Sequence, residues 1–258
     1  MRQRKYYRPT RLIDRPKPPW GDCSMRRWFC IGLFALACIA LKAEATQAAG
    51  QPSATMEERL QACAACHGAK GEGIDNPYFP RLAGKPAGYL YNQLLAFKND
   101  RRHYPPMTYL LEYLPETYLQ SMADYFAAQR PPFPAPAIPD VSKDMLEHGE
   151  HLVLQGDPER EIPACVKCHG PTLTGMEPAI PSLLGLRPIY ISGQLGAWRY
   201  GTRTAKEPDC MQIVAGHLTE DDVKALAAYL SSQPAPADLS PAPKGSYKTP
   251  LACGSEPQ

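Results

Sequence analysis

Two short segments of the chain carry cysteine and histidine in the same order and at the same spacing. These segments are Cys63-Ala-Ala-Cys66-His67 and Cys165-Val-Lys-Cys168-His169. Thiols three positions apart lie about one helical turn from each other, where each can form a thioether with a haem vinyl group. The adjacent histidine then projects towards the iron. The two segments therefore predict two covalently bound haem c groups, with the four cysteines as anchors and His67 and His169 as axial iron ligands.

Two other uses of CxxC pairs fit this sequence less well. The pairs are 102 residues apart, which is too distant for an ordinary zinc ribbon, and zinc knuckles do not require a following histidine. A thioredoxin-like dithiol needs a βαβ context that the sequence lacks. The order of residues favours haem over zinc or disulfide exchange.

The attachment segments belong to a longer internal repeat. The stretch from Pro80 to Gln93 recurs 101 residues later, and the stretch from Met107 to Tyr125 recurs 104 residues later. A nearly constant offset indicates two homologous domains with small loop differences. We predict domains at 46–129 and 142–233, a proline-rich linker at 130–141 and a tail at 234–258.

Apolar residues at helical spacing predict helices at corresponding places in both repeats. They precede the attachment segments at 56–65 and 143–154, and lie in the middle of each repeat at 89–97 and 190–198. A last helix follows Pro115 in the first repeat and Thr219 in the second, where Asp222 stands at the capping-box position. The predicted fold class is all-α, with each domain a small helical fold around one haem.

Met107 and Met211 are the predicted sixth ligands of the two irons. They lie 40 and 42 residues after the attachment histidines, each in a proline-containing loop ahead of the last helix. Methionine also fills cores, but the matched positions favour ligation. Ligation by histidine and methionine raises the haem potential relative to two histidines and closes both axial positions. Such an iron suits electron transfer better than oxygen or peroxide chemistry.

Four other side chains compete for these axial positions. Met122 lies on the apolar face of the predicted last helix, and Met176 is only seven residues from His169. His103 and His217 have no counterpart in the other repeat. None of the four matches the recurrence of the two preferred methionines.

Some further residues have roles that the sequence leaves open. A backbone carbonyl at Pro80 or Pro181 would accept the ring N–H of the haem histidine, but each is equally well an ordinary turn proline. Cys210 and Cys253 form either a disulfide or two free thiols. Packing around the haem, or a plain core or surface role, is open for Tyr89, Tyr190, Gln93, Gln194, Trp198 and Arg199.

The N-terminal residues predict export. Arg26 and Arg27 precede an uncharged run of 14 residues at 28–41, and Ala43-Glu44-Ala45 offers a cleavage site. We expect a signal peptide at 1–45, with Met25 as an alternative start, and a periplasmic location. A lipoprotein anchored at Cys38 is a less favoured alternative. Removal of 1–45 leaves 18 basic and 23 acidic residues of the original 28 and 26. This negative balance disfavours a nucleic-acid partner.

With these motifs, residues 55–233 resemble the dihaem cytochrome c4 family. The resemblance is clearest in the stretch from Gly193 to Arg203, at Met211, and from Leu218 to Leu230. It implies two class I cytochrome c domains with His/Met ligation and loose membrane association. It also implies transfer of electrons from a quinol-oxidising complex or a dehydrogenase to a haem-copper terminal oxidase. The first domain departs more from the family pattern, through His103-Tyr-Pro-Pro-Met107 and the tyrosine-rich segment after it.

The sequence thus favours an electron carrier over an enzyme. A dihaem peroxidase or a haem oxidoreductase acting on sulfur compounds is an alternative that requires one iron without methionine. A cytochrome subunit fixed to a dehydrogenase is another.

Overall fold

The computed structural model describes residues 54–76 and 78–256. The predicted signal peptide, its start and its cleavage site, and Cys38 all lie outside these residues. None of the described helices is long and apolar enough to cross a membrane. We call residues 54–129 the first lobe, 142–233 the second lobe and 234–256 the tail.

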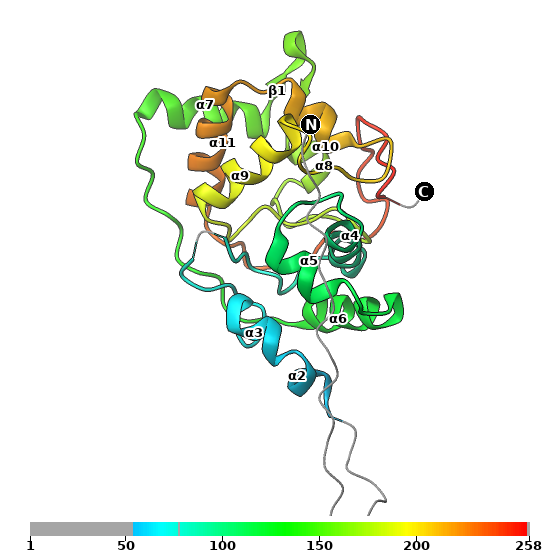
Figure 1. The fold of residues 1–258 in the computed structure, drawn as a ribbon. Coiled ribbons are helices and arrows are strands. Elements are labelled where there is room, and N and C mark those ends of the chain that lie inside the picture. Colours follow the sequence, from blue (N-terminus) through cyan, green and yellow to red (C-terminus); the bar gives the residue numbers. More distant parts are fainter. Residues whose placement is uncertain (1–53, 77, 257–258) are drawn as a thin grey trace, which may run out of the picture. The chain divides into compact units, whose positions relative to one another are not determined.

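The described residues are mainly helical, and Figure 1 shows the helices of the two lobes in succession along the chain. The first lobe contains α2 (Met56–Arg59), α3 (Gln61–His67), α4 (Ala87–Lys98), α5 (Pro105–Leu111) and α6 (Glu116–Ala128). The second contains α7 (Lys143–Leu154), β1 (Gly156–Asp157), η1 (Pro158–Arg160), β2 (Ile162–Pro163), α8 (Val166–His169), α9 (Pro188–Arg199), α10 (Cys210–Gly216) and α11 (Glu220–Ser232). The strands β1 and β2 pair antiparallel, Gly156 opposite Pro163.

The middle and last helices of each repeat form where their apolar patterns predict them. α4 and α9 cover the predicted middle helices, and α6 and α11 begin directly after Pro115 and Thr219. The capping box is present, because the Thr219 hydroxyl accepts from the Asp222 N–H and the Asp222 carboxylate accepts from the Thr219 N–H. This reciprocal pair satisfies two donors that a helix start leaves free.

Three local expectations differ from the structure. The predicted first helix is divided at Leu60 into α2 and α3. Between α7 and the second attachment segment the chain inserts β1, η1 and β2. The predicted loops around Met107 and Met211 are the short helices α5 and α10, because Pro105 and Pro106 are compatible with a first helical turn and the Asp209 side chain caps α10 at 3.1 Å.

Each lobe has its own apolar core, and the first cysteine of each attachment segment packs against it. The first core consists of Leu60, Leu90, Phe97, Leu111, Leu119, Met122, Ala123 and Phe126. The second includes Leu152, Val153, Ile162, Leu173, Leu184, Ile191, Leu195, Leu218, Val223, Leu226, Ala227 and Leu230. α4 packs on α6 in the first lobe, and α7 and α9 pack on α11 in the second.

The linker and the tail contain no described helix, and both are fixed to the lobes. The Arg81 guanidinium donates to the carbonyls of Pro131 and Pro132 at 2.6 and 2.8 Å, and the N–H of Ala137 donates to Ser231 at 2.9 Å. In the tail, the carbonyl of Ala242 accepts from the N–H of Glu177 at 2.8 Å. The linker therefore contacts both lobes instead of hanging free between them.

Candidate haem sites

His67 and His169 are held in the same orientation by backbone carbonyls. The Nδ1 of His67 lies 2.9 Å from the carbonyl oxygen of Pro80, and that of His169 lies 2.8 Å from Pro181. An Nδ1–H that donates to a carbonyl leaves Nε2 unprotonated and free to bind a metal. Burial lowers the pKa of both imidazoles, which favours this neutral form. The two prolines thus supply the carbonyls that one interpretation of the sequence expected.

Each attachment histidine ends a helix and is followed by a glycine. Gly68 and Gly170 have φ of 84° and 82°, a backbone conformation that glycine adopts without strain. The chain therefore turns away directly after the histidine, and both imidazoles remain buried with 7% of their surface exposed. The same turn in both lobes keeps the ring facing inward.

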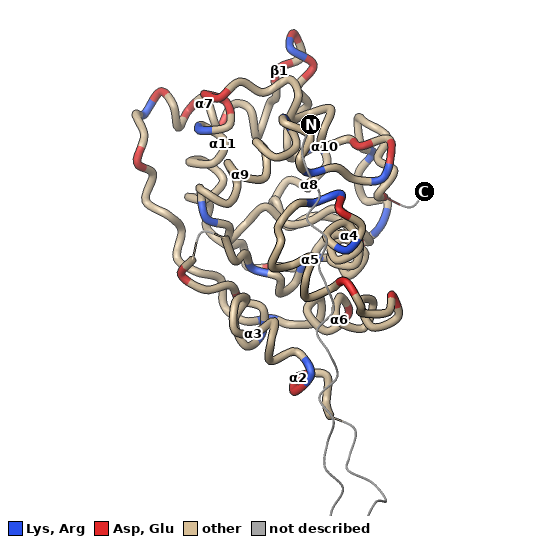
Figure 2. The backbone as a smooth tube through the Cα atoms, in the orientation of Figure 1, with Lys and Arg blue, Asp and Glu red and all other residues tan. Residues whose placement is uncertain are grey.

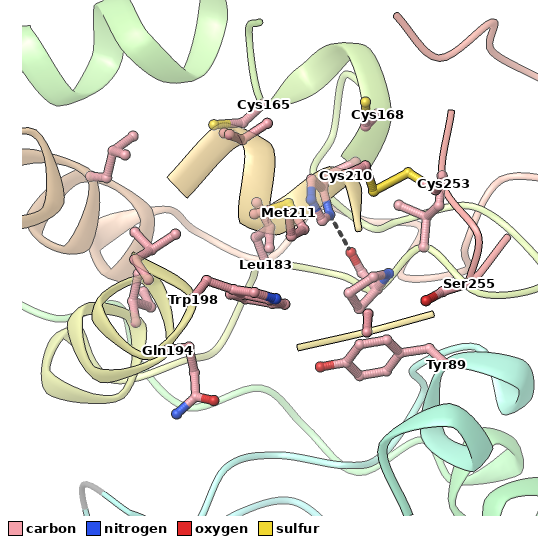
Figure 3. Close-up of a pocket in the computed structure, with 18 of the residues that line it drawn as sticks. Tyr89, Cys165, Cys168, Leu183, Gln194, Trp198, Cys210, Met211, Cys253 and Ser255 are labelled. Atoms are coloured by element: carbon pink, nitrogen blue, oxygen red, sulfur yellow. Dashed lines mark hydrogen bonds between the residues drawn. A yellow bond between two sulfur atoms is a disulfide. The ribbon is translucent and has the colours of Figure 1, made fainter. Parts of the chain in front are cut away.

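An apolar cavity of about 530 Å³ in the first lobe brings together Cys63, Cys66, His67 and Met107. A second cavity of about 190 Å³ brings together Cys165, Cys168, His169 and Met211. Figure 3 shows Cys165, Cys168, Met211 and Trp198 around the second cavity. All eight predicted site residues thus lie, four and four, along two cavities, and none of the four attachment cysteines forms a disulfide.

The competing side chains divide into two groups. Met122 and His103 line the first cavity beside Met107, whereas Met176 and His217 lie outside the lining of the second. By the repeat offsets, the counterparts of Met122 and His103 are Leu226 and Thr204, neither of which can take the place of an axial ligand. Met107 is the side chain of the first cavity whose counterpart is again methionine.

A polar cluster separates the two cavities and forms a wall of both. Lys85, Tyr89, Gln93, Tyr190, Gln194 and Arg203 line each of them. Of the six side chains whose roles the sequence left open, Tyr89, Tyr190, Gln93, Gln194 and Trp198 therefore line a cavity. Arg199 does not, and lies over the Tyr200 ring at 5.6 Å.

At the centre of this cluster, a glutamine of each lobe accepts hydrogen bonds from an arginine of both lobes. The Gln93 side-chain oxygen accepts from Arg102 at 3.0 Å and from Arg203 at 2.7 Å. That of Gln194 accepts from the same two arginines at 2.7 and 2.8 Å. The two arginines also pair as an isolated antiparallel bridge. Arg102 stacks on Phe97 at 4.4 Å and Arg203 stacks on Trp198 at 3.7 Å.

Sequence reasoning missed Arg102, Arg203 and Lys85. The two arginines follow the middle helices and are separated by the repeat offset of 101. This matched position could have identified them from the sequence. Lys85 has Leu186 at that offset, so the repeat offers no signal for it.

The cavities fit haem in their charge as well as in their anchors. Lys85, Arg102 and Arg203 are buried, and within residues 54–76 and 78–256 none of them forms an ion pair. Burial lowers the pKa of Lys85 to about 8, so its charge is incompletely compensated by the protein. The buried indole N–H of Trp198 also has no acceptor among the described residues. The two propionates of a haem are anions and acceptors of the kind that these groups require.

Comparison with known proteins agrees with this geometry. The cytochrome c family profile matches residues 48–119. Cytochrome c4 of Pseudomonas aeruginosa is 35% identical over 71% of this chain and 86% of its own length. The chain belongs to the dihaem cytochrome c4 family. It carries two covalent haem c groups and transfers electrons between redox partners.

Other relatives of this cytochrome carry more specific names. A "thiosulfate dehydrogenase electron acceptor" of Thiomonas intermedia is 35% identical over 80% of this chain and 89% of its own length. Among solved structures, reduced cytochrome c4 from Pseudomonas stutzeri has a TM-score of 0.60 at 30% identity, covering 68% of this chain and 95% of that one. The thiosulfate dehydrogenase TsdBA of Marichromatium purpuratum has a TM-score of 0.61 at 38% identity, covering 67% of this chain but 36% of that one.

The open question of Cys210 and Cys253 is resolved by the structure, which joins them in a disulfide. Cys210 is the first residue of α10 and precedes Met211, so the bond fixes the tail beside the second cavity (Figure 3).

Proposed function

We propose that this cytochrome is a periplasmic one-electron carrier in which both irons are held by histidine and methionine. His67 and Met107 would bind one iron and His169 and Met211 the other, with the CxxC thiols as covalent anchors. When bound, each haem carries one electron by cycling between ferric and ferrous iron. The observation that carries the proposal is that the same set of two thiols, one carbonyl-oriented imidazole and one thioether lines each cavity.

The residues supply three functions in this mechanism. The proline carbonyls fix each imidazole, the methionine would supply the second protein ligand of each iron, and the apolar walls would limit access of water. The polar cluster that belongs to both cavities gives electrons a short route between the lobes. The proposal also includes two domains at 46–129 and 142–233, export through a signal at 1–45, and peripheral association with a membrane.

For the partners, we infer a dehydrogenase or a quinol-oxidising complex as donor and a haem-copper oxidase as acceptor. The names of two relatives, each a thiosulfate dehydrogenase electron acceptor at 35% or 36% identity, favour a dehydrogenase of thiosulfate as the donor. On this view the chain receives electrons and carries out no substrate chemistry of its own.

The decisive experiment replaces the two methionines separately. Met107→Ala and Met211→Ala should each abolish about half of the Met–iron charge-transfer absorption of the oxidised protein, because each sulfur serves one iron. Met122→Leu is the matched control: it changes a methionine of the first cavity to the residue type of its counterpart, and should leave the band intact.

Intact mass and a pyridine haemochrome assay complete the test. They should report two haems and a chain that begins near residue 46. An oxidised wild-type protein with an open coordination position at one iron would instead favour a haem peroxidase or a sulfur-compound oxidoreductase.

A further inference from the structure

The helix that carries Met107 presents an apolar, aromatic surface to solvent. Tyr109 and Tyr113 are 78% and 84% exposed, and Leu110 is 46% exposed. Pro106 and Leu110 also line the first cavity, so this surface lies at the cavity's mouth. We call Pro106, Tyr109, Leu110 and Tyr113 the α5 face.

In the second lobe the tail lies against the start of the corresponding helix, α10. At the offset of 104, the counterparts of Tyr109 and Tyr113 are Ile213 and His217. Next to them the disulfide holds the tail on α10, and the N–H of Gly254 donates to the carbonyl of Pro208 at 2.9 Å. Leu251, Cys253, Ser255 and Glu256 of the tail line the second cavity. Figure 3 shows Cys253 and Ser255 at its edge.

The tail also reaches the first lobe. The carbonyl of Ser255 accepts from the side-chain amide of Asn92 on α4 at 3.1 Å. The tail is cross-linked to α10 through Cys253 and hydrogen-bonded to α4 through Ser255. It is therefore fixed across the second cavity. A partner protein that approaches the second cavity therefore meets the tail beside α10, although Ile213 itself is 44% exposed.

The charged residues near the α5 face indicate the charge of the partner. Residues 104–129 contain Glu112, Glu116 and Asp124 and no lysine or arginine (Figure 2). Arg59, which also lines the first cavity, is preceded in the sequence by Glu57 and Glu58. The Lys98 ammonium, which also lies close to this face, donates to the carbonyl of Leu114. An apolar surface beside these carboxylates complements an apolar patch that is surrounded by basic side chains.

We propose that the α5 face is the surface through which this cytochrome exchanges electrons with an external redox protein, and that this partner carries an apolar patch ringed by lysine and arginine. The tail directs such partners away from the second cavity. The proposal rests on the electron-carrier function proposed above and adds where the exchange occurs. Exposed tyrosines provide large contact area at low cost in side-chain entropy, which makes them effective docking residues.

The test uses mitochondrial cytochrome c, a lysine-rich redox protein, as the probe. The reduced chain is mixed with the ferric probe in a stopped-flow instrument, and the second-order rate constant is measured at several salt concentrations. Tyr109→Ser/Tyr113→Ser should lower the rate constant roughly tenfold. The matched control Ile213→Ser/His217→Ser changes the counterpart positions on α10 and should leave it within about twofold.

Binding is measured separately from electron transfer. With both proteins ferric, surface plasmon resonance should show weaker binding of the tyrosine variant and unchanged binding of the α10 control. Glu112→Gln/Glu116→Gln should reduce the dependence of the rate on salt, because two steering charges are removed. In a Cys210→Ser/Cys253→Ser background, where the tail is no longer fixed, the α10 substitutions should begin to lower the rate.

Two results would overturn the proposal. One is an equal or larger effect of the α10 substitutions in the protein with its disulfide intact. The other is a dimer of this chain in sedimentation that the tyrosine substitutions dissociate, since the α5 face would then be covered by a second copy. Reductive titration of every protein keeps the two proposals apart: a wild-type chain that takes up fewer than two electrons contradicts the carrier function itself.

Discussion

The two lobes place the same chemical groups around their cavities, but their first helices are held differently. α7 is continuous and buries Gly149, Leu152 and Val153, and a Cβ at Gly149 would overlap the backbone carbonyl of Ala225 on α11. This close approach lets α7 pack along α11. In the first lobe, α2 buries no residue and α3 buries only His67. The first attachment segment is therefore anchored to its core mainly through the intervening Leu60.

The second lobe has two further supports. Only 2% of the Asp222 side chain on α11 is exposed. Its carboxylate accepts from Arg160 at 2.7 Å and from His148 at 2.7 Å. At the offset of 104 the first lobe has Tyr118 in this place. The second lobe also carries the disulfide to the tail. The comparison indicates that the haem residues and the shared polar cluster are repeated, whereas the scaffold behind them differs and makes the second lobe the more stable one.

Removing the disulfide should have the largest effect on this difference. Cys210→Ser/Cys253→Ser opens a loop of 43 residues, for which chain entropy predicts a loss of about 4 kcal/mol from the stability of the second lobe. Hydrogen exchange read by mass spectrometry measures both lobes in one experiment. Protection should fall in α7 and α11 and stay unchanged in α4 and α6. An equal fall in all four helices would mean that the lobes unfold as one unit and that the comparison is wrong.

Removing the charge of Asp222 should have the next largest effect. Asp222→Asn breaks its pairs with Arg160 and His148 and weakens the capping box, at a cost of about 3 kcal/mol to the second lobe. This value is at the low end for buried pairs, because 35% and 40% of the two partners' side chains are exposed. Urea unfolding followed by Trp198 fluorescence measures it. Tyr118→Phe at the counterpart position should change stability by less than about 0.5 kcal/mol.

The same carboxylate predicts a dependence on pH. Burial alone raises the pKa of Asp222, but hydrogen bonds from Arg160, Thr219 and His148 outweigh it and hold the pKa well below its ordinary value. The stabilisation is therefore complete above the unfolded pKa of about 3.9 and is lost as the pH falls towards the native pKa. Wild-type protein should lose stability of the second lobe below about pH 4, and Asp222→Asn should lose less there. Parallel curves for the two proteins would contradict this assignment.

Features that repeat or that follow a local pattern could be predicted from the sequence. The repeat paired Met107 with Met211, and helical spacing located α4, α6, α9 and α11. The Thr219 capping box is a four-residue pattern and is present as expected. The hydrogen bond from each histidine to a proline carbonyl could also be anticipated, because the two residues are only 12 or 13 positions apart.

The remaining features depend on contacts between distant residues. Arg102 meets Gln194 across 92 positions, and a buried arginine resembles a surface one in sequence. The insertion of β1, η1 and β2 has no counterpart in the first repeat, so the repeat could not predict it. Pairing of Cys210 with Cys253 requires a distance between Cα atoms, 5.0 Å here, that no spacing rule supplies.

The smallest effect should come from the part that the lobes share. Gln93→Leu and Gln194→Leu each remove an oxygen that accepts from both arginines, so each should cost about 2 kcal/mol. Because the bonds are reciprocal, the two losses should be equal within about 0.5 kcal/mol, although the lobes differ in their other supports. Gln120→Leu, which removes only an exposed bond to Asp124, is the control. Urea unfolding gives the losses, and redox titration should show the separation between the two haem potentials changing equally in both variants. If one variant lost clearly more stability than the other, the shared cluster would depend mainly on one lobe. The haem residues would then be equivalent in the two repeats, whereas the polar cluster between the cavities would not.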